Sequence, residues 1–121
     1  MATGAGNDEI EVRWSAVGGG LALDSGAGND AITLGFSTVG LNAVIGTGSG
    51  NDVVSSTGLT TRLNLFVYLG PGDDTLALEN AAAFTAFLYG GPGTNSLTTN
   101  AATRDGIRTL KYFTFQAVNN F

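Results

Sequence analysis

The sequence predicts an all-β protein, a parallel β-solenoid (β-helix or β-roll) with about 22 residues per coil. Two observations predict it: a Gly-x-Gly turn motif recurs along the chain, and alternating apolar residues follow each copy. The copies begin at Gly4, Gly26, Gly48, Gly70 and Gly91, so their spacing is constant except that the last interval is one residue shorter. A repeat this short cannot bury an apolar face alone, but stacked copies share one continuous core. We therefore expect four full coils in residues 1–100, and a C-terminal capping or assembly segment in residues 101–121.

The turn motif opens each repeat. It reads Gly-Ala-Gly-Asn-Asp in the first two copies, Gly-Ser-Gly-Asn-Asp in the third, Gly-Pro-Gly-Asp-Asp in the fourth and Gly-Pro-Gly-Thr-Asn in the fifth. Glycine adopts positive φ at no steric cost, and Asn and Asp side chains bond to nearby backbone in tight turns. The motif is therefore suited to reversing the chain between two strands.

A strand is predicted after each turn. An apolar residue lies two positions after the Asp, or after Asn95 in the fifth copy, and a second often follows two positions later. This period of two is typical of a strand with one buried face. The first row is Ile10, Ile32, Val54, Leu76 and Leu97, and the second is Val12, Leu34 and Leu78, with Ser56 and Thr99 interrupting it.

A bend and a second strand complete each repeat. Trp14 and Phe36 occupy the bend in the first two repeats, where we expect them to fill the core. The inward pairs of the second strand are Leu21 and Leu23, Ala43 and Ile45, Leu65 and Val67, and Ala86 and Leu88. The residues predicted to form an outward aromatic row are Phe66, Tyr68, Phe87 and Tyr89. Such a row indicates contact with a neighbouring chain or cover by the tail.

The last residues differ from the repeats. Residues 108–121 are rich in aromatic residues and threonine, which predicts a final strand or two capping the solenoid, in preference to a helix. Residues 1–100 carry nine acidic and two basic side chains, a net charge of −7, whereas residues 101–121 carry one acidic and three basic, a net charge of +2. An open acidic start and a basic end favour head-to-tail stacking of copies, which propagates into a fibre or surface matrix.

Composition excludes several functions. The 121 residues include no cysteine and no histidine, so disulfides, thiolate zinc sites and Ser-His-Asp catalysis are absent. Ten acidic residues against five basic ones argue against nucleic acid as a partner, and no apolar run has the length of a membrane span. The acids outside the turns are scattered along the chain, so we expect no enzyme. The alternative is a small polysaccharide-active β-helix with an acid pair in a groove.

Stacking in register places Asp8, Asp30, Asp52 and Asp74 in one column, with neighbours about 5 Å apart. Like charges at this spacing repel. A hard cation shared between successive turns, with backbone carbonyls of the glycine-rich turns completing its shell, relieves the repulsion, and calcium suits such oxygen ligands. The alternative is that the turns hold themselves, because Asp and Asn side chains cap the backbone.

Three segments, 25–33, 69–77 and 90–98, resemble the calcium-binding nonapeptide Gly-Gly-x-Gly-x-Asp-x-apolar-x of RTX proteins. The resemblance implies a Ca²⁺ site between successive turns. It implies as ligands the carboxylates of Asp8, Asp30, Asp52 and Asp74 and the backbone carbonyls of Gly6, Gly28, Gly50 and Gly72. The family's first glycine is replaced in four copies, by Thr3, Ser25, Thr47 and Leu69, and its Asp by Asn95 in the fifth.

The predicted function is that of a non-enzymatic, calcium-binding structural or adhesive solenoid, extracellular or at the cell surface. Its predicted partners are copies of itself, arranged head to tail or laterally. External calcium near millimolar fills such sites, so folding would follow export. The alternative is an ice-binding solenoid of the RTX type, for which Asn7, Asn29 and Asn51 offer a partial outward array.

Overall fold

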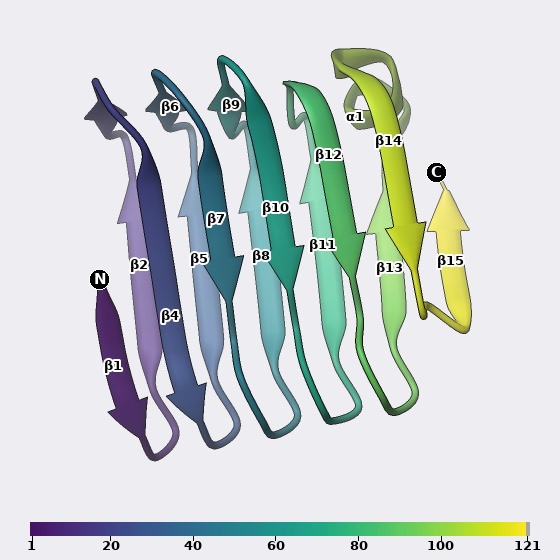
Figure 1. Ribbon diagram of the computed structural model, residues 1–121. Coiled ribbons are helices and arrows are strands. Elements are labelled where there is room, and N and C mark those ends of the chain that lie inside the picture. Colours follow the sequence, from purple (N-terminus) through teal and green to yellow (C-terminus); the bar gives the residue numbers. More distant parts are fainter. Residues whose placement is uncertain (121) are drawn as a thin grey trace.

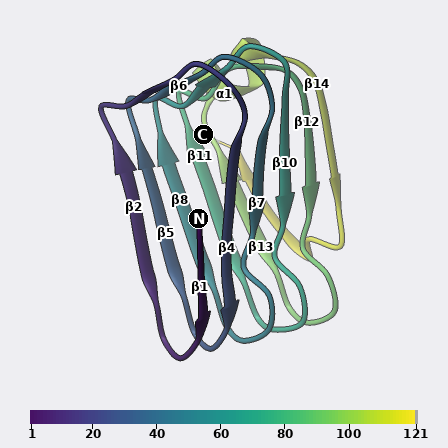
Figure 2. The same ribbon diagram turned by 60° about the vertical axis from the view of Figure 1, so that its left-hand side comes forward.

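The computed structural model, which describes residues 1–120, is a parallel β-solenoid, as the sequence predicts (Figure 1). Two six-stranded sheets form its long walls, and Figure 2 shows them facing each other. Sheet A contains β1 (Ala2–Ala5), β4 (Leu21–Ala27), β7 (Ala43–Gly46), β10 (Asn64–Tyr68), β12 (Ala83–Tyr89) and β14 (Ile107–Phe113). Sheet B contains β2 (Glu9–Arg13), β5 (Ala31–Gly35), β8 (Val53–Thr57), β11 (Thr75–Glu79), β13 (Ser96–Thr99) and β15 (Ala117–Asn120).

A third, short sheet lies at the bend between the two walls. Its three strands are β3 (Ala16–Val17), β6 (Thr38–Val39) and β9 (Thr60–Thr61). Strands this short carry too little alternation to be detected in the sequence, which predicts only a bend here. Each of the first three coils therefore contributes to three sheets.

The strands stack in register, so equivalent residues of successive coils lie above one another. In sheet B, Ile32 pairs with Ile10 on one side and with Val54 on the other. The shorter fourth repeat keeps this register because its missing residue is absorbed at one corner. Thr60 still bridges to Ala82 at the regular interval, whereas Asn64 pairs with Thr85, one residue sooner.

The predicted inward rows form the core. The two apolar rows of sheet B and the pairs of sheet A are buried in the middle coils, where Ile32, Val54, Leu76, Ala43 and Leu88 are fully inaccessible to solvent. Apolar side chains stacked in this way keep water out along the whole solenoid axis.

The expectation that Trp14 and Phe36 fill the core is wrong. Their side chains are 76% and 53% exposed, and the rings stack on each other outside the bend with centroids 4.6 Å apart. Both residues have positive φ, at 51° and 44°, which turns their side chains outward. The same bend position holds Gly58 and Asn80, residue types that adopt this conformation readily.

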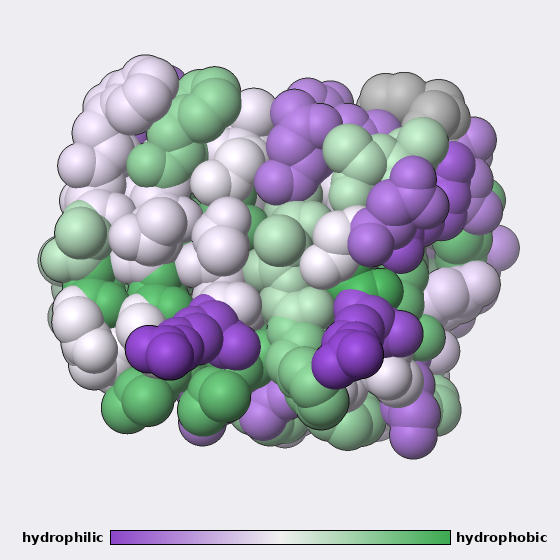
Figure 3. Space-filling model, turned by 90° about the horizontal axis from the view of Figure 1, so that it is seen from above, coloured by the Kyte–Doolittle hydropathy of each residue, from purple (hydrophilic) through white to green (hydrophobic). Residues whose placement is uncertain are grey.

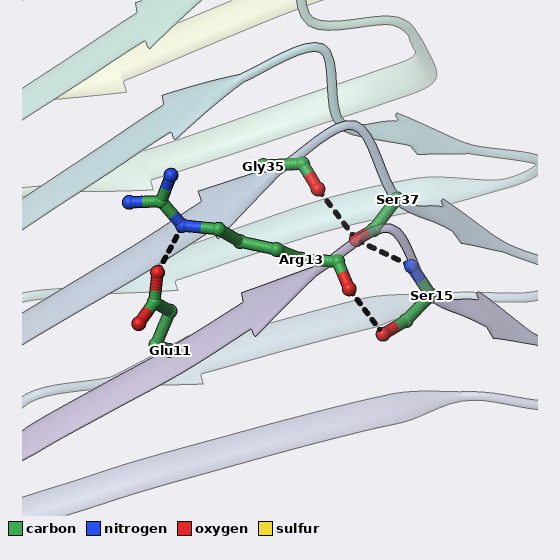
Figure 4. Close-up of polar contacts among 5 residues, drawn as sticks. All are labelled: Glu11, Arg13, Ser15, Gly35 and Ser37. Carbon is green, nitrogen blue, oxygen red and sulfur yellow. Dashed lines mark hydrogen bonds and ion pairs between the residues drawn. The ribbon is translucent and has the colours of Figure 1, made fainter.

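Serine side chains support these two strained bends (Figure 4). The Ser15 hydroxyl donates to the Arg13 carbonyl at 2.9 Å, and the Ser37 hydroxyl donates to the Gly35 carbonyl at 2.8 Å. The Ser15 N–H in turn donates to the Ser37 hydroxyl at 3.2 Å. Hydroxyls placed in this way stabilise a left-handed bend that an aromatic residue disfavours.

The C-terminal segment continues the stack. Strand β14 pairs with β12 and strand β15 pairs with β13, so both predicted tail strands are present and residues 101–120 add a fifth coil. A six-residue helix, α1 (Ala101–Gly106), stands where the earlier coils have a short third strand, and the sequence pattern does not predict it. Within the described residues, no helix has the length and apolarity needed to cross a membrane.

Candidate functional site

The five Gly-x-Gly turns form one edge of the solenoid, along the bottom of Figure 1, where sheet A passes into sheet B. The predicted aspartates are brought together there in a single column. The side chains of Asp30, Asp52 and Asp74 are 2%, 1% and 1% exposed, so burial is nearly complete in the middle of the stack. This edge is the candidate site.

Each aspartate binds the coil before it. The N–H of Asp8 donates to Oδ1 of Asp30, that of Asp30 to Asp52, and that of Asp52 to Asp74, each at 2.8 Å. Asn95 and Gln116 extend this aspartate ladder, because the N–H of Asp74 donates to Asn95 Oδ1 at 2.9 Å and that of Asn95 to Gln116 Oε1 at 2.7 Å. Side-chain oxygens thus satisfy buried backbone donors where the sheets are interrupted.

The residue before each aspartate forms a second ladder that runs the opposite way. The N–H of Asn29 donates to Asn7 Oδ1, and that of Asn51 to Asn29 Oδ1, both at 2.8 Å. The ladder continues in the same direction, because the Asp73 N–H donates to Asn51 Oδ1 and the Thr94 N–H donates to Asp73 Oδ1. The asparagines predicted as a partial outward array are exposed, but their amide oxygens bond along the stack.

A third ladder, made of hydroxyl groups, is not predicted from the sequence. The hydroxyls of Thr3, Ser25 and Thr47 donate to the carbonyl of the equivalent residue one coil on, at 2.7, 3.1 and 2.7 Å. In the sequence these positions look only like departures from the RTX pattern. A hydroxyl that recurs once in each of the first three repeats was the signal that could have identified them.

Close stacking of the coils explains the glycines. The second glycine of each turn has φ between +124° and +152°. A Cβ on Gly28 would lie 1.9 Å from the Gly6 carbonyl oxygen, one on Gly50 1.8 Å from that of Gly28, and one on Gly72 1.6 Å from that of Gly50. The predicted calcium-binding carbonyls thus lie against the backbone of the next coil, and no side chain fits between them.

The second oxygen of each carboxylate is a buried atom without a hydrogen-bond partner, in Asp8, Asp30, Asp52 and Asp74 alike. Burial raises the pKa of the Asp52 and Asp74 carboxyls above the ordinary value. For Asp52 the negative charge of Asp30 raises the pKa further, whereas the hydrogen bond that the Asp30 N–H donates to its Oδ1 lowers the pKa. For Asp74 the neighbouring charges of Asp52 and Asp73 act in the same direction as burial.

These raised pKa values predict a protein that is more stable in mild acid. A carboxyl that binds its proton more tightly in the folded state favours folding once it is protonated. The free energy of unfolding contributed by Asp52 and Asp74 should therefore be fully present below the ordinary Asp pKa of about 4 and be lost as the pH rises through the raised pKa values. Urea denaturation at a series of pH values measures this. Asp52→Asn/Asp74→Asn should flatten the profile, and an equally steep profile in that variant would contradict the assignment.

The turns fit a calcium ion only in part. Calcium takes about six to eight oxygen ligands, but Oδ1 of Asp30, Asp52 and Asp74 already accepts an N–H, which leaves one free carboxylate oxygen in each of these three turns. The middle carbonyls of the turns are also engaged, since those of Ala27 and Ser49 accept the N–H of the preceding coil's second glycine. Among the described residues, no three Asp, Glu, His or Cys side chains form a group able to hold a metal. In this arrangement the protein's own hydrogen bonds join the turns.

Comparisons with known proteins add no assignment, because no family model, no curated protein and no solved structure matches this chain. The fold and the site therefore rest on the chain's own sequence and geometry.

Proposed function

We propose that this protein is a non-catalytic structural β-solenoid whose ends each accept a further coil of the same register. That coil comes from a second copy, or from an adjoining segment of a longer chain. The observation that supports this most directly is the continuity of the inter-coil ladders, which join every coil to the next through the protein's own side chains. A structure that propagates by repeating one contact is suited to a rigid spacer, fibre or adhesive stalk.

Both ends of the described stack offer strands and apolar side chains to such a coil. Strands β1 and β2 are edge strands at one end, and β14 and β15 at the other. Parts of the core are open at the ends, where Val12 and Leu21 on one side and Leu110 and Val118 on the other are only partly buried. Open strand edges and uncovered apolar surface both favour association. The opposite charges of residues 1–100 and 101–121 fit a head-to-tail arrangement.

A proline at Glu9 tests this end-on contact. The N–H of Ala31, the equivalent residue one coil on, donates back to the Asp8 carbonyl, so the Glu9 N–H points to the open edge and not into the stack. Glu9→Pro should remove this donor and leave the internal hydrogen bonds in place, because proline is tolerated on edge strands. Glu9→Ala is the matched control, since it removes the same charge but keeps the N–H.

Sedimentation velocity and electron microscopy over a range of concentrations give the readout. We expect linear multimers of the wild type and of Glu9→Ala, and a several-fold loss of multimers in Glu9→Pro. Trp14 is the only tryptophan and its ring lies at this end of the stack, so its emission should shift to shorter wavelength on assembly. Wild-type protein that never associates beyond a closed dimer would contradict the end-on proposal, as would equal assembly of the two variants.

Calcium binding is a second candidate, supported by the unpartnered Oδ2 atoms of the aspartate ladder. A cation beside these atoms would offset the charge of the buried column and would place the working protein outside the cell, where calcium is plentiful. It requires the turns to open enough for further oxygens to reach the ion. A melting temperature that rises when calcium is added to chelator-treated protein would support it, and equal melting temperatures in calcium and in chelator would contradict it.

A further inference from the structure

The outer face of sheet A carries most of the exposed large apolar side chains of the described chain. Six of them lie on its strands, and two more lie at the corner where the chain enters β7 and β10. Tyr112 pairs with the inward Leu88, so it belongs to the inner row at the open end of the stack. The others are Val44, Tyr68, Phe84, Tyr89 and Phe113, with Leu41 and Leu63 at the corner. On the sheet B strands the only large exposed apolar residue in the described range is Val53. Seen from above, hydrophobic side chains gather along the lower edge of the molecule, on the side of sheet A (Figure 3).

The C-terminal half of this face is an aromatic ridge. Phe66 and Phe87 stack with ring centroids 5.4 Å apart and planes within 3° of parallel. Tyr68, Tyr89 and Phe113 form a second row beside them, because these three residues pair in register across β10, β12 and β14. The two rows of rings border a shallow pocket of about 380 Å³ between them.

The N-terminal half of the same face is a hollow. Its floor is made of small residues, including Ala22, Gly46 and Gly48, and its volume is about 970 Å³. Tyr68 and Tyr89 of the ridge border it. One half of the face therefore carries small residues around a hollow, and the other half carries large aromatic side chains.

The charges on the face divide in the same way. Asp24 is the only acidic residue on the strands of sheet A, and it lines the hollow. The basic residues Arg108 and Lys111 lie on β14 at the ridge, where Arg108 Cζ is 5.3 Å from the Phe84 ring centroid and Lys111 Nζ is 5.7 Å from that of Phe87. An acid in the hollow and two cations at the ridge favour opposite placement of two such faces.

We propose that two copies of this chain pair face to face through sheet A, about a two-fold axis parallel to the strands. This axis reverses the order of the coils, so the ridge of each copy enters the hollow of the other. The same two-fold rotation brings Asp24 of each copy toward Arg108 and Lys111 of the other copy. The dimer therefore contains this charge contact twice. A two-fold contact of this kind closes at the dimer.

The size of the face sets the expected strength. Six strands about 4.8 Å apart, with about five residues of 3.3 Å along each, give a flat area of roughly 450 Å². A standard stable interface buries about 800 Å² on each partner. The pair is therefore below standard size, which is typical of weak or transient contacts, so we expect a dimer whose population rises with protein concentration.

Gly46→Val tests the pairing without weakening the fold. A Cβ on Gly46 would meet its nearest atoms, backbone oxygens of Leu23 and Tyr68, at 3.9 and 4.0 Å, which is ordinary contact. Valine suits a strand, but here it would fill the hollow that receives the ridge. Ala31→Val is the matched control, because it adds the same side chain to a sheet B strand away from this face.

Sedimentation equilibrium measures the dimer dissociation constant. Every variant also carries Glu9→Pro, so that end-on growth does not interfere. We expect a dimer that Ala31→Val keeps and that Gly46→Val weakens at least ten-fold, with a melting temperature no lower than that of the Glu9→Pro protein. Asp24→Lys should weaken the dimer, and adding Lys111→Glu should restore part of it. A monomer at all concentrations, an unchanged dimer in Gly46→Val, or a monomer whose ridge binds soluble polysaccharide would overturn the proposal. Each of these outcomes leaves the end-on contact to its own test.

Discussion

Gly50→Ala should destabilise the protein by about 3 kcal/mol, because the backbone conformation and the close stacking of the coils both exclude a side chain. The φ of Gly50 is +136°, and a non-glycine residue held in so sparsely populated a region costs about 1–3 kcal/mol. The added Cβ would also lie 1.8 Å from the Gly28 carbonyl oxygen, so the two coils must separate, and such overpacking costs about 1–3 kcal/mol. Urea denaturation followed by circular dichroism measures the loss.

Gly19→Ala is the control for this prediction. A methyl group added at Gly19 would have no atom within 4 Å, and the φ of Gly19 lies outside the left-handed range. We expect its free energy of unfolding to change by less than about 1 kcal/mol, and in the stabilising direction, because alanine restricts the unfolded chain. Equal losses in the two variants would mean that close coil stacking is not what requires glycine in the turns.

Asp52→Ala should cost about 2 kcal/mol, whereas Asp52→Asn should cost far less. Alanine leaves the buried N–H of Asp30 without its acceptor, and an unsatisfied buried donor costs about 1–3 kcal/mol. Asparagine keeps that acceptor and removes a charge from the column. Asn95 shows how an amide fits, since its Oδ1 accepts from Asp74 while its Nδ2 donates to the Gly91 carbonyl at 2.9 Å.

The melting temperatures of the wild type, Asp52→Ala and Asp52→Asn are compared in chelator and in calcium. In chelator we expect the melting temperature of Asp52→Asn to equal or exceed that of the wild type, and that of Asp52→Ala to be the lowest of the three. An Asn variant as unstable as the Ala variant would mean that the carboxylate charge itself is needed. A wild type that gains stability with calcium, beside an Asn variant that does not, would assign the free carboxylate oxygens to the ion.

Most of the fold was predictable because the repeat imposes it. The constant period of the turn motif set the register, and the alternation after each turn identified the buried rows, such as the one through Ile32 and Val54. The bend was not predictable from alternation. Trp14 and Phe36 look like core residues in the sequence, and only their left-handed conformation, held by Ser15 and Ser37, turns them outward.

For the site, the sequence predicted the column but not its bonding. Spacing alone brings Asp30, Asp52 and Asp74 together, as observed. The same Gly-x-Gly-Asn-Asp residues are suited both to a cation and to capping the neighbouring coil, so composition could not decide between them. The direction of each hydrogen bond follows from side-chain rotamers. Those depend on coil stacking and not on the local sequence.

The two opposed ladders at the turns also have a consequence for how such a chain changes in length during evolution. In the second and third turns the asparagine serves the coil after it and the aspartate serves the coil before it, so these two turns present the same acceptors to both neighbours. Duplicating or deleting the repeat that begins at either of these turns therefore reconnects both ladders without a compensating change. A single inserted residue within a strand would instead shift every later side chain of that strand to the opposite face. We therefore expect related chains to differ more readily in the number of repeats than in the length of a strand.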